Sequence, residues 1–567
     1  MKRSLKNIIM IIIIVLMIGA IYLTINSNSS SIPNGNPPSM PPGENNGTPP
    51  PKPEENDNIA DDIALNTTDN PDNNQTSPDM SKSSSSTSTI TYVLLGVESL
   101  VIASTGMYLV LSGFNKKSFK ETMADKNKIV IGGLATVIIT GGVTYLCTTF
   151  IGSNNGHSMP NGSGPGSSGN SSSITYQASK EITSDEEITS GEYSSTNALE
   201  NAISISNAKA TLSGITVTKT GDSDGGDSTS FYGNNSAILA KDGAEVTITN
   251  ATIIANANGA NGVFSYGGSA TTNNSNTDGT TVNISNSKIT TTGDNAGGIM
   301  TTGGGIMNAT NLQISTSGRS SAAIRSDRGG GVVTVDGGTY KTEGIGSPAI
   351  YSTADITVKN ATLLSTSSEG AIIEGKNSIT LENVNLTDTN NKLNGQSTTY
   401  KNVFLYQSMS GDAATGKAVF TAKDSTITTN KGDSFYVTNT IAEINLENNK
   451  IINNDSNGYF LRIQKDSWGN SGSNGGNVTL NMTNQNVNGN IYVDSISKLT
   501  MNMDNSSFEG AINKDNTAKF ISLKLDSKST IKLTSDSYIT SLEDEDTNYS
   551  NIDFNGYKLY VNGKAIN

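Results

Sequence analysis

The segment AAIRSDRGGG, residues 322–331, contains the residues best suited to acid–base chemistry. Arg325, Asp327 and Arg328 place one carboxylate between two guanidinium groups, and an arginine or a carboxylate of this kind can cleave an acidic polysaccharide. A two-carboxylate mechanism or a calcium cage needs further carboxylates at matched positions in neighbouring segments, and none is visible. The sequence therefore favours an ion pair that closes a turn over a catalytic site.

A second acidic segment, GDSDGGDS, offers possible ligands for a cation. Asp222, Asp224 and Asp227 provide the carboxylate oxygens that Ca²⁺ prefers, but their spacing does not match an EF-hand loop. An ordinary solvated loop is the favoured interpretation. We expect no cofactor, we leave Ca²⁺ as a possibility, and we assign no metal ligands.

A recurring triplet gives the most detailed local signal: a small residue, a branched aliphatic residue and then a variable one. In a strand, alternate side chains share a face. Because Arg325 must reach water, Ile324 and its equivalents are predicted to point inward, and the variable position then forms a column on the outer face. Continued along the chain, this predicted column contains Leu239, Phe264, Met300, Arg325, Tyr351, Ile373, Tyr436, Arg462 and Tyr492.

Aromatic rings in such a column can stack on sugar rings, and arginine can bind a carboxylate or sulfate through two hydrogen bonds. An alternative remains open, in which inserted loops fold over this face and bury it. If the face is exposed, the ligand-binding residues are predicted to be Phe264, Arg325, Tyr351, Tyr436, Arg462 and Tyr492.

These residues are positioned by a short repeat, clearest over residues 331–386. Each copy has two apolar residues that alternate with polar ones, then a Gly or Asn, and another apolar residue soon after. The turn residues Gly337, Asn360 and Asn383 are 23 residues apart. Alternation with period two, broken by turn residues, predicts short strands.

The same unit recurs about a dozen times, which is typical of a solenoid. Intervals range from 21 to 41 residues, and the long ones contain Gly, Asn, Asp and Ser, as expected of loops inserted into a constant coil. With strands and no helix, each unit predicts one coil of a parallel β-solenoid. The predicted turn residues outside 331–386 are Gly214, Asn250, Asn286, Asn311, Asp424, Asn448, Asn484, Asn505 and Ser535.

Asn and Gly suit these corners because they reach the left-handed conformation most easily. Stacked Asn side chains can also hydrogen-bond from coil to coil. On this pattern, and on the segments GSPAIYSTADI (346–356) and GYKLYVNGKAI (556–566), the chain resembles right-handed parallel β-helix proteins of the pectate-lyase-like superfamily. It is most similar to bacterial surface β-helices labelled carbohydrate-binding, and to adhesins. The resemblance spans residues 174–567 and implies an all-β fold.

Composition and the ends of the solenoid agree with this fold. A hydrophobic content of 34% suits a thin core and argues against a large globular enzyme. The net charge of −14 makes nucleic acid an unsuitable partner, and the single Cys147 excludes an internal disulfide framework. Residues 174–205 lack the coil pattern and are predicted to cap the first coil, while the alternating tail after residue 550 is predicted to close the other end.

Three apolar runs near the N-terminus predict transmembrane helices, and the run over residues 8–25 favours an uncleaved anchor over a cleaved signal peptide. Lysines near residue 1 and between the second and third runs place these segments inside the cell, and the solenoid outside. The predicted organisation is span 1–25, Pro/Asn/Ser-rich disordered linker 26–89, span 90–114, basic cytoplasmic loop 115–128, span 129–151, flexible linker 152–173 and ectodomain 174–567.

Together these features lead us to expect a multi-pass protein of the cell membrane with an extracellular β-helix. The resemblance implies a bacterial, non-catalytic carbohydrate-binding module or adhesin, whose partner is an extracellular polysaccharide or a host or cell-wall glycan. Two alternatives stay open: a polysaccharide lyase or hydrolase of the pectate-lyase-like superfamily, and a structural rod of the envelope.

Overall fold

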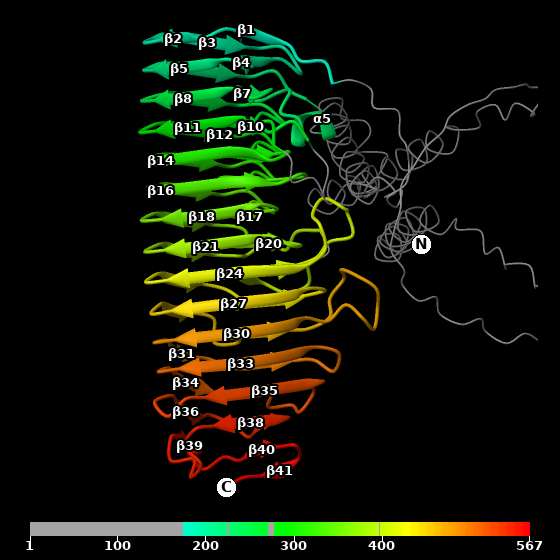
Figure 1. Cartoon of the computed structure of the whole chain (residues 1–567). Helices are drawn as coiled ribbons and strands as arrows, with labels where there is room; N and C mark the ends of the chain where they lie inside the picture. Colours follow the sequence, from blue (N-terminus) through cyan, green and yellow to red (C-terminus); the bar gives the residue numbers. More distant parts are fainter. Residues whose placement is uncertain (1–173, 224–225, 270–276, 396) are drawn as a thin grey trace, which may run out of the picture. The chain divides into compact units, whose positions relative to one another are not determined.

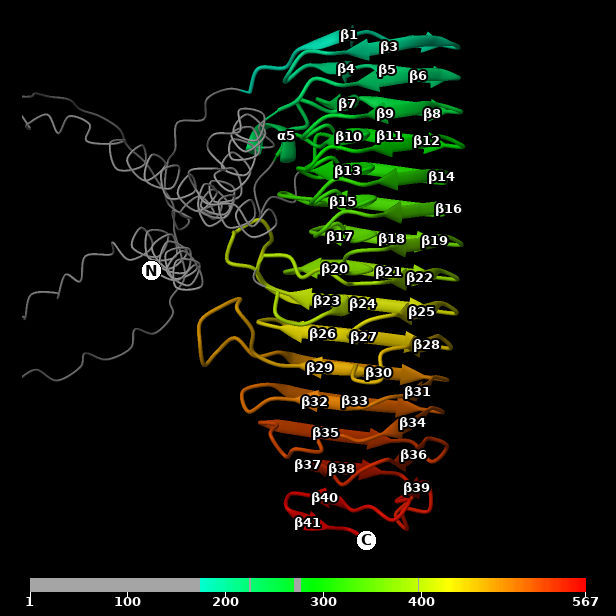
Figure 2. The ribbon, with the colours of Figure 1, turned by 180° about the vertical axis from the view of Figure 1, so that it is seen from behind.

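A computed structural model describes residues 174–223, 226–269, 277–395 and 397–567, all within one compact unit, Gly162–Asn567. These residues form a stack of parallel strands, coil upon coil (Figures 1 and 2). The only helix among them is the four-residue α5 (Asp227–Ser230). The predicted all-β, solenoid-like fold is therefore confirmed for the described residues.

Sheet 1 carries the first strand of each coil and has 12 strands, which agrees with the expected dozen coils. Each of its strands pairs in parallel with the next one down the stack. The strands are β1 (Ala178–Ile182), β4 (Asn201–Ser206), β7 (Ile238–Lys241), β10 (Val263–Tyr266), β13 (Ile299–Thr302), β15 (Ile324–Ser326), β17 (Ile350–Ser352), β20 (Ala371–Glu374), β23 (Lys401–Tyr406), β26 (Asp433–Thr438), β29 (Leu461–Ile463) and β32 (Ile491–Val493).

Sheet 2, with 22 strands, contains the second and third strands of the coils as two columns. The columns join where two 12-residue strands run through the turn between them, β14 (Gly305–Thr316) and β16 (Gly331–Thr342). The other strands of the first column are β2 (Glu186–Ile188), β5 (Lys209–Ser213), β8 (Glu245–Thr249), β11 (Thr281–Ser285), β18 (Asp355–Lys359), β21 (Ser378–Glu382), β24 (Lys417–Lys423), β27 (Ile441–Glu447), β30 (Asn477–Thr483), β33 (Lys498–Asp504), β35 (Phe520–Leu525) and β38 (Ser541–Asp544).

After its last strand in sheet 2, the second column continues down the stack as a separate four-stranded sheet. Its strands in sheet 2 are β3 (Gly191–Ser195), β6 (Ile215–Lys219), β9 (Thr252–Ala255), β12 (Lys288–Thr291), β19 (Thr362–Ser365), β22 (Asn385–Asp388), β25 (Thr426–Thr429) and β28 (Lys450–Asn453). The four-stranded sheet consists of β31 (Asn486–Asn488), β34 (Ser507–Gly510), β36 (Thr530–Leu533) and β39 (Ile552–Asp553).

The two ends differ from the middle. At the C-terminal end, β37 (Ser537–Ile539) pairs in parallel with β40 (Leu559–Val561), which then pairs antiparallel with β41 (Lys564–Ala565). This hairpin closes the stack, as the alternating tail predicts. The expected N-terminal cap is wrong in part, because β1, β2 and β3 form a coil in register with the next one.

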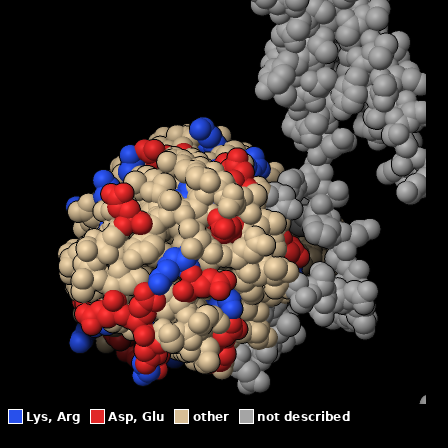
Figure 3. Space-filling view, turned by 90° about the horizontal axis from the view of Figure 1, so that it is seen from above, with Lys and Arg blue, Asp and Glu red and all other residues tan. Residues whose placement is uncertain are grey.

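Charged side chains gather on the N-terminal end, seen from above in Figure 3. Glu181, Glu187 and Glu192 are exposed on the first coil. An exposed edge strand invites pairing with another chain, and charges oppose this. The first coil can therefore end the stack without a separate cap.

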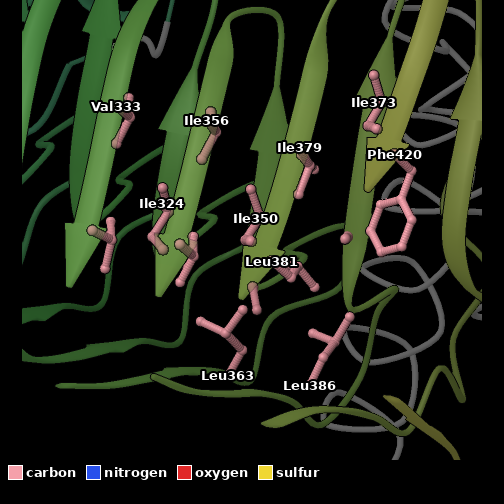
Figure 4. Packing of buried hydrophobic residues seen from close by; sticks show 14 of the residues in the cluster. Ile324, Val333, Ile350, Ile356, Leu363, Ile373, Ile379, Leu381, Leu386 and Phe420 are labelled. Carbon is pink, nitrogen blue, oxygen red and sulfur yellow. The ribbon is translucent and has the colours of Figure 1, made fainter. Parts of the chain in front are cut away.

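The core lies between the sheets and comes from the alternating apolar residues of the repeat. Ile356, Val358 and Leu363 are fully buried and pair in register with Ile379, Leu381 and Leu386 one coil below (Figure 4). Equivalent residues thus form aliphatic stacks along the solenoid. The predicted period and inward face are confirmed.

Left-handed turns separate the two columns of sheet 2, as predicted from the Asn and Gly residues. Asn360 and Asn383 have φ of 53° and 55°, and the amide of Asn383 donates to the Asn360 side chain at 2.8 Å. The expectation for Ser535 is wrong, since it lies between β36 and β37. The equivalent turn follows β35, where Asp526 accepts a hydrogen bond from the Asn505 backbone at 3.1 Å.

The predicted membrane spans and linkers, residues 1–173, lie outside the described residues. Within the described part of the solenoid unit, no helix has the length and hydropathy needed to cross a membrane. Asp224 of the GDSDGGDS segment also lies outside the described residues, whereas Asp222 and Asp227 lie within them.

Candidate functional site

The outer column of sheet 1 exists as one continuous register through ten coils. Ile324 and Ile350 are fully buried in the core, so the predicted inward face of these strands is correct. Ile373 is also in the core, and its neighbour Ile372 occupies the column instead. The outer column therefore consists of Leu239, Phe264, Met300, Arg325, Tyr351, Ile372, Phe404, Tyr436, Arg462 and Tyr492.

Much of this column is covered by side chains from the loops. Leu239, Phe264 and Met300 form a cluster separate from the core, and Phe264 is 0% exposed. Tyr436 is also 0% exposed and packs with Phe404. The expectation that the column faces water is thus wrong for Phe264 and Tyr436. At these residues the alternative holds, in which inserted loops fold over this face and bury it.

Arg325 is also buried, at 9% exposure. Its guanidinium lies 3.0 Å from the Asp327 carboxylate and donates to the backbone oxygen of Ser320 at 3.1 Å. The preferred interpretation of AAIRSDRGGG, an ion pair, is therefore confirmed for Arg325 and Asp327. Its expected exposure is wrong, since these contacts turn the guanidinium away from water.

Arg328 contacts a loop that the sequence did not connect with it. Its guanidinium lies 2.7 Å from Asp412, 84 residues further along the chain. Asp412 belongs to the segment between β23 and β24, residues 407–416, which we call the β23–β24 loop. This ion pair fixes the loop over the outer face of sheet 1.

Glu374 lies under the same loop and is 1% exposed. Its carboxylate accepts hydrogen bonds from the hydroxyl groups of Tyr351, Tyr406 and Ser408, of which the Tyr406 contact is 2.9 Å long. Tyr351, one of the predicted binding residues, is half-buried here. The cluster therefore satisfies a buried carboxylate with hydroxyl donors alone.

Three carboxylates come close together in this region. Burial raises the pKa of Asp327 and of Glu374, and the nearby charge of Asp412 raises both further. The sequence singled out Asp327 alone, because Glu374 and Asp412 lie in segments far from it along the chain. A raised pKa suits a general acid, but the β23–β24 loop lies over the groups.

Lys401 lies in a second covered cluster, 0% exposed. Its ammonium is 4.4 Å from the ring centre of Phe404 and 4.9 Å from that of Tyr436, with Trp468 at 5.9 Å. Burial lowers the pKa of Lys401, while Glu369 opposes this shift. Lys401 and Trp468 were not predicted as part of this face.

The column opens toward the C-terminal end, where Arg462 and Tyr492 are only partly buried. The Arg462 side chain is 20% exposed and pairs with Asp433. Its guanidinium lies 4.3 Å from the ring centre of Tyr459 and 5.4 Å from that of Tyr492. Both predicted residues therefore reach the surface together.

Below Tyr492 the column continues in a way that the sequence analysis missed. Tyr492 is in register with Asn513, since Ile491 pairs with Ile512, and the backbone of Tyr538 donates to Ile512. Tyr538 in turn pairs with Tyr560. The alternation in SYI and LYV was the available signal. We call the five residues Arg462, Tyr492, Asn513, Tyr538 and Tyr560 the aromatic strip.

The possible calcium site at the acidic segment depends on the positions of the described carboxylates. In the described ranges no group of three or more His, Cys, Asp or Glu side chains is arranged to hold a metal ion. Asp222 accepts a hydrogen bond from the backbone of Asn258 at 2.8 Å, and Asp227 lies 4.0 Å from Arg328. Both carboxylates thus have protein partners.

Comparisons with known proteins leave the function to be argued from these residues. No protein-family model, curated protein or solved structure matches the chain.

Proposed function

We propose that the solenoid binds an extracellular polysaccharide at the aromatic strip and does not cleave it. The observation that carries this proposal is the position of Tyr492 and Tyr538, two partly exposed rings in one column with the small residue Asn513 between them. Because neighbouring strands lie about 4.8 Å apart, the two tyrosines are separated by about 10 Å along the stack.

The contacts of these two tyrosines determine where a sugar ring can lie. Tyr492 contacts Tyr459, which belongs to the coil above, and Tyr538 stacks on Tyr560 of the coil below. Asn513 turns its amide to the backbone oxygen of Tyr538 at 3.2 Å. Asn513 is only 3% exposed, because its side-chain oxygen accepts a hydrogen bond from the backbone of Thr517 at 3.0 Å, so the segment after it covers the space between the two rings. The exposed sides of the Tyr492 and Tyr538 rings are therefore the surface that is open to a ligand. A pyranose ring has apolar faces that can stack on them.

Arg462 favours an acidic sugar. Its contact with Asp433 uses the Nε and Nη2 groups, and a guanidinium has five N–H donors in all. The remaining donors can bind a uronate carboxylate or a sulfate. The net charge of −14 opposes a polyanion at long range, so moderate salt should strengthen this binding by screening the repulsion.

The place of the chain in the cell is part of the same proposal. The three apolar runs and the flanking lysines support a multi-pass anchor with the solenoid outside. The coil pattern supports membership of the right-handed, pectate-lyase-like β-helices, and an adhesin-like role. A protease added to intact cells should then remove the solenoid and leave residues 115–128 protected.

A polysaccharide lyase or hydrolase is the second candidate. The proximity of Asp327, Glu374 and Asp412 favours it, since glycoside hydrolysis is carried out by a pair of carboxyl groups, one acting as the acid and one as the base or nucleophile. The β23–β24 loop must open before a substrate reaches them, because Glu374 is 1% exposed. For this reason we favour a binding function over a function in cleavage.

One experiment separates the candidates. The full-length chain, purified in a mild detergent, is incubated with pectins, mucin glycans and bacterial cell-wall polymers. Saturable binding without products supports the binding module, and release of shortened or unsaturated sugars supports the enzyme. If neither binding nor products are found, the structural rod is the remaining candidate.

A further inference from the structure

The corner between β22 and β23 buries an unusual group of oxygen atoms inside the solenoid. Asp388 ends β22, Asn390 follows it, and Asn402 lies at the start of β23. Their exposures are 0%, 1% and 0%. This corner is separate from the aromatic strip and from the carboxylates under the β23–β24 loop.

The hydrogen bonds of these side chains show which of their atoms are left without a partner. The Asn390 amide nitrogen donates to the backbone oxygen of Lys401 at 2.9 Å, and that of Asn402 donates to Thr428 at 3.0 Å. Because the NH₂ groups take these donor roles, the amide oxygens must occupy the other positions. Asp388 accepts at Oδ2 from the Asn390 backbone at 3.0 Å. The backbone N–H groups of Asn430 and of Asp388 itself also lie near this carboxylate.

Three buried acceptors are left over. Oδ1 of Asp388, Oδ1 of Asn390 and Oδ1 of Asn402 have no hydrogen-bond partner among the described residues. A buried acceptor without a partner keeps its full desolvation penalty, and this penalty is larger when the acceptor is charged. Three such oxygen atoms on the residues of this corner therefore favour the binding of a group that carries positive charge or protons.

The three side chains share neighbours. Asp388 pairs in register with Thr429, whose hydroxyl accepts a hydrogen bond from Asn402 at 3.1 Å. Asn402 Oδ1 occupies space beside Gly370, only 2.2 Å from where a Cβ atom would lie. Glycine at that position therefore lets the Asn402 oxygen enter the corner.

No cation of the described chain neutralises Asp388 by direct contact. Lys401 directs its ammonium to Ser397 and to the backbone oxygen of Thr399, and its carboxylate contact is Glu369 at 3.8 Å. Glu369 adds further negative charge near Asp388. The corner therefore combines a carboxylate, two amide oxygens and a nearby second carboxylate.

We propose that this corner binds a hard, oxygen-ligated cation within the solenoid. Carboxylate and amide oxygens are the ligands that Ca²⁺ takes in proteins, and water molecules complete its shell. Small monovalent cations accept the same oxygen ligands. A single water is a poorer partner, because its two hydrogens serve two of the three acceptors and leave the charge uncompensated.

A proton is the main competitor of the cation. Burial raises the pKa of Asp388 well above its usual value, with Glu369 adding to the shift. A protonated Asp388 supplies one donor, which leaves another acceptor unpaired. The two explanations differ in whether stability depends on metal ions at constant pH.

The test measures the thermal midpoint, Tm, of the full-length chain in detergent after chelation and dialysis into a tetramethylammonium buffer. CaCl₂, MgCl₂, KCl and NaCl are then added at equal ionic strength. We expect one of these cations to raise Tm saturably. The ion that does so shows whether the site binds a divalent or a monovalent cation. If no cation raises Tm above the tetramethylammonium control, a proton or a water fills the corner and the proposal is wrong.

Asp388→Asn is the diagnostic variant, since an amide can donate to the neighbouring oxygen and needs no cation. It should raise the midpoint cation concentration at least ten-fold. The control is Asp515→Asn, which removes the same charge at an exposed site and should keep the wild-type response. A response retained in Asp388→Asn but lost in Asp222→Asn would assign the ion to the GDSDGGDS segment and overturn the proposal. If Asp388→Asn fails to fold, the wild-type titration still overturns the proposal when no cation raises Tm, and Asp222→Asn still distinguishes this corner from the GDSDGGDS segment.

Discussion

Tyr538 of β37 and Tyr560 of β40 stack face to face, with ring centres 4.6 Å apart and ring planes at 5°. Both rings remain partly exposed. By contrast, the column residue Phe404, higher in the stack, is covered: Tyr406 stacks on it at 4.5 Å, and Trp468 lies against both rings. The outer face formed by sheet 1 and the closing strands β37 and β40 is thus covered at Phe404 and accessible at Tyr538 and Tyr560.

The first prediction concerns the inward face of sheet 1. Ile350→Ala should lower the free energy of unfolding by about 2–5 kcal/mol, because the buried side chain leaves a cavity. Tyr351→Phe, one residue on, should cost about 1–3 kcal/mol, because Glu374 loses one hydroxyl donor. Urea denaturation followed by circular dichroism measures both values. A tolerated Ile350→Ala would mean that the strand faces are reversed.

A second prediction tests the left-handed turns. Asn383→Ala should destabilise the protein by about 1–2 kcal/mol, because alanine is strained at φ of 55°. It also removes the hydrogen bond to Asn360. Asn383→Gly is the matched control, since it loses the same hydrogen bond but accepts this φ. If both variants cost the same in urea denaturation, backbone strain plays no part at the turn.

The repeat and its corners could be predicted from sequence because both depend on local physics. Residues such as Ile356 and Val358 alternate with polar neighbours, and Asn reaches positive φ more easily than other side chains. The error at Ile373 has an equally local cause. Its neighbour Ile372 is chemically the same, so the triplet did not reveal which isoleucine faces the core.

The sequence left open whether inserted loops cover the outer face, and it could not show which residues they cover. Asp412 meets Arg328 across 84 residues, and Ser408 meets Glu374 across 34, through loops that have no repeat. Only the stacking of coils brings these segments together. The exposure of Phe264, Arg325 and Tyr436 was therefore mispredicted, whereas Arg462 and Tyr492 lie where the loops leave the column open.

A third prediction follows from the buried carboxylate of Glu374. Burial raises its pKa above 4.5, so the folded state holds this proton more tightly than the unfolded state. Its contribution to stability is therefore complete below pH 4.5 and is lost as the pH rises through the folded pKa. Compared with Glu374→Gln, the wild type should lose stability as the pH rises above 4.5, as measured by urea denaturation.

Glu443 supplies a control of opposite sign. A hydrogen bond from Lys417 lowers the pKa of this carboxyl below 4.5, so its contribution is present above that pH and is lost as the pH falls through the folded pKa. Relative to Glu443→Gln, the wild type should lose stability on acidification. Equal pH dependence in the two comparisons would contradict the assignment of Glu374.

Binding at the aromatic strip is the central claim, and it rests on Tyr492 and Tyr538. Replacing either ring with alanine should weaken polysaccharide binding by about 1–3 kcal/mol, since stacking of the sugar on that ring is lost. Tyr557→Ala is the control, because Tyr557 is 39% exposed on the segment before β40 and lies outside the strip.

The most direct measurement is isothermal titration calorimetry of the wild type and these three variants with the polysaccharide that binds best. Circular dichroism confirms that each variant keeps its strand signal. The account predicts unchanged affinity in Tyr557→Ala and affinity reduced about 5- to 150-fold in Tyr492→Ala and Tyr538→Ala. Wild-type affinity in both strip variants would contradict it and move the binding site away from the aromatic strip.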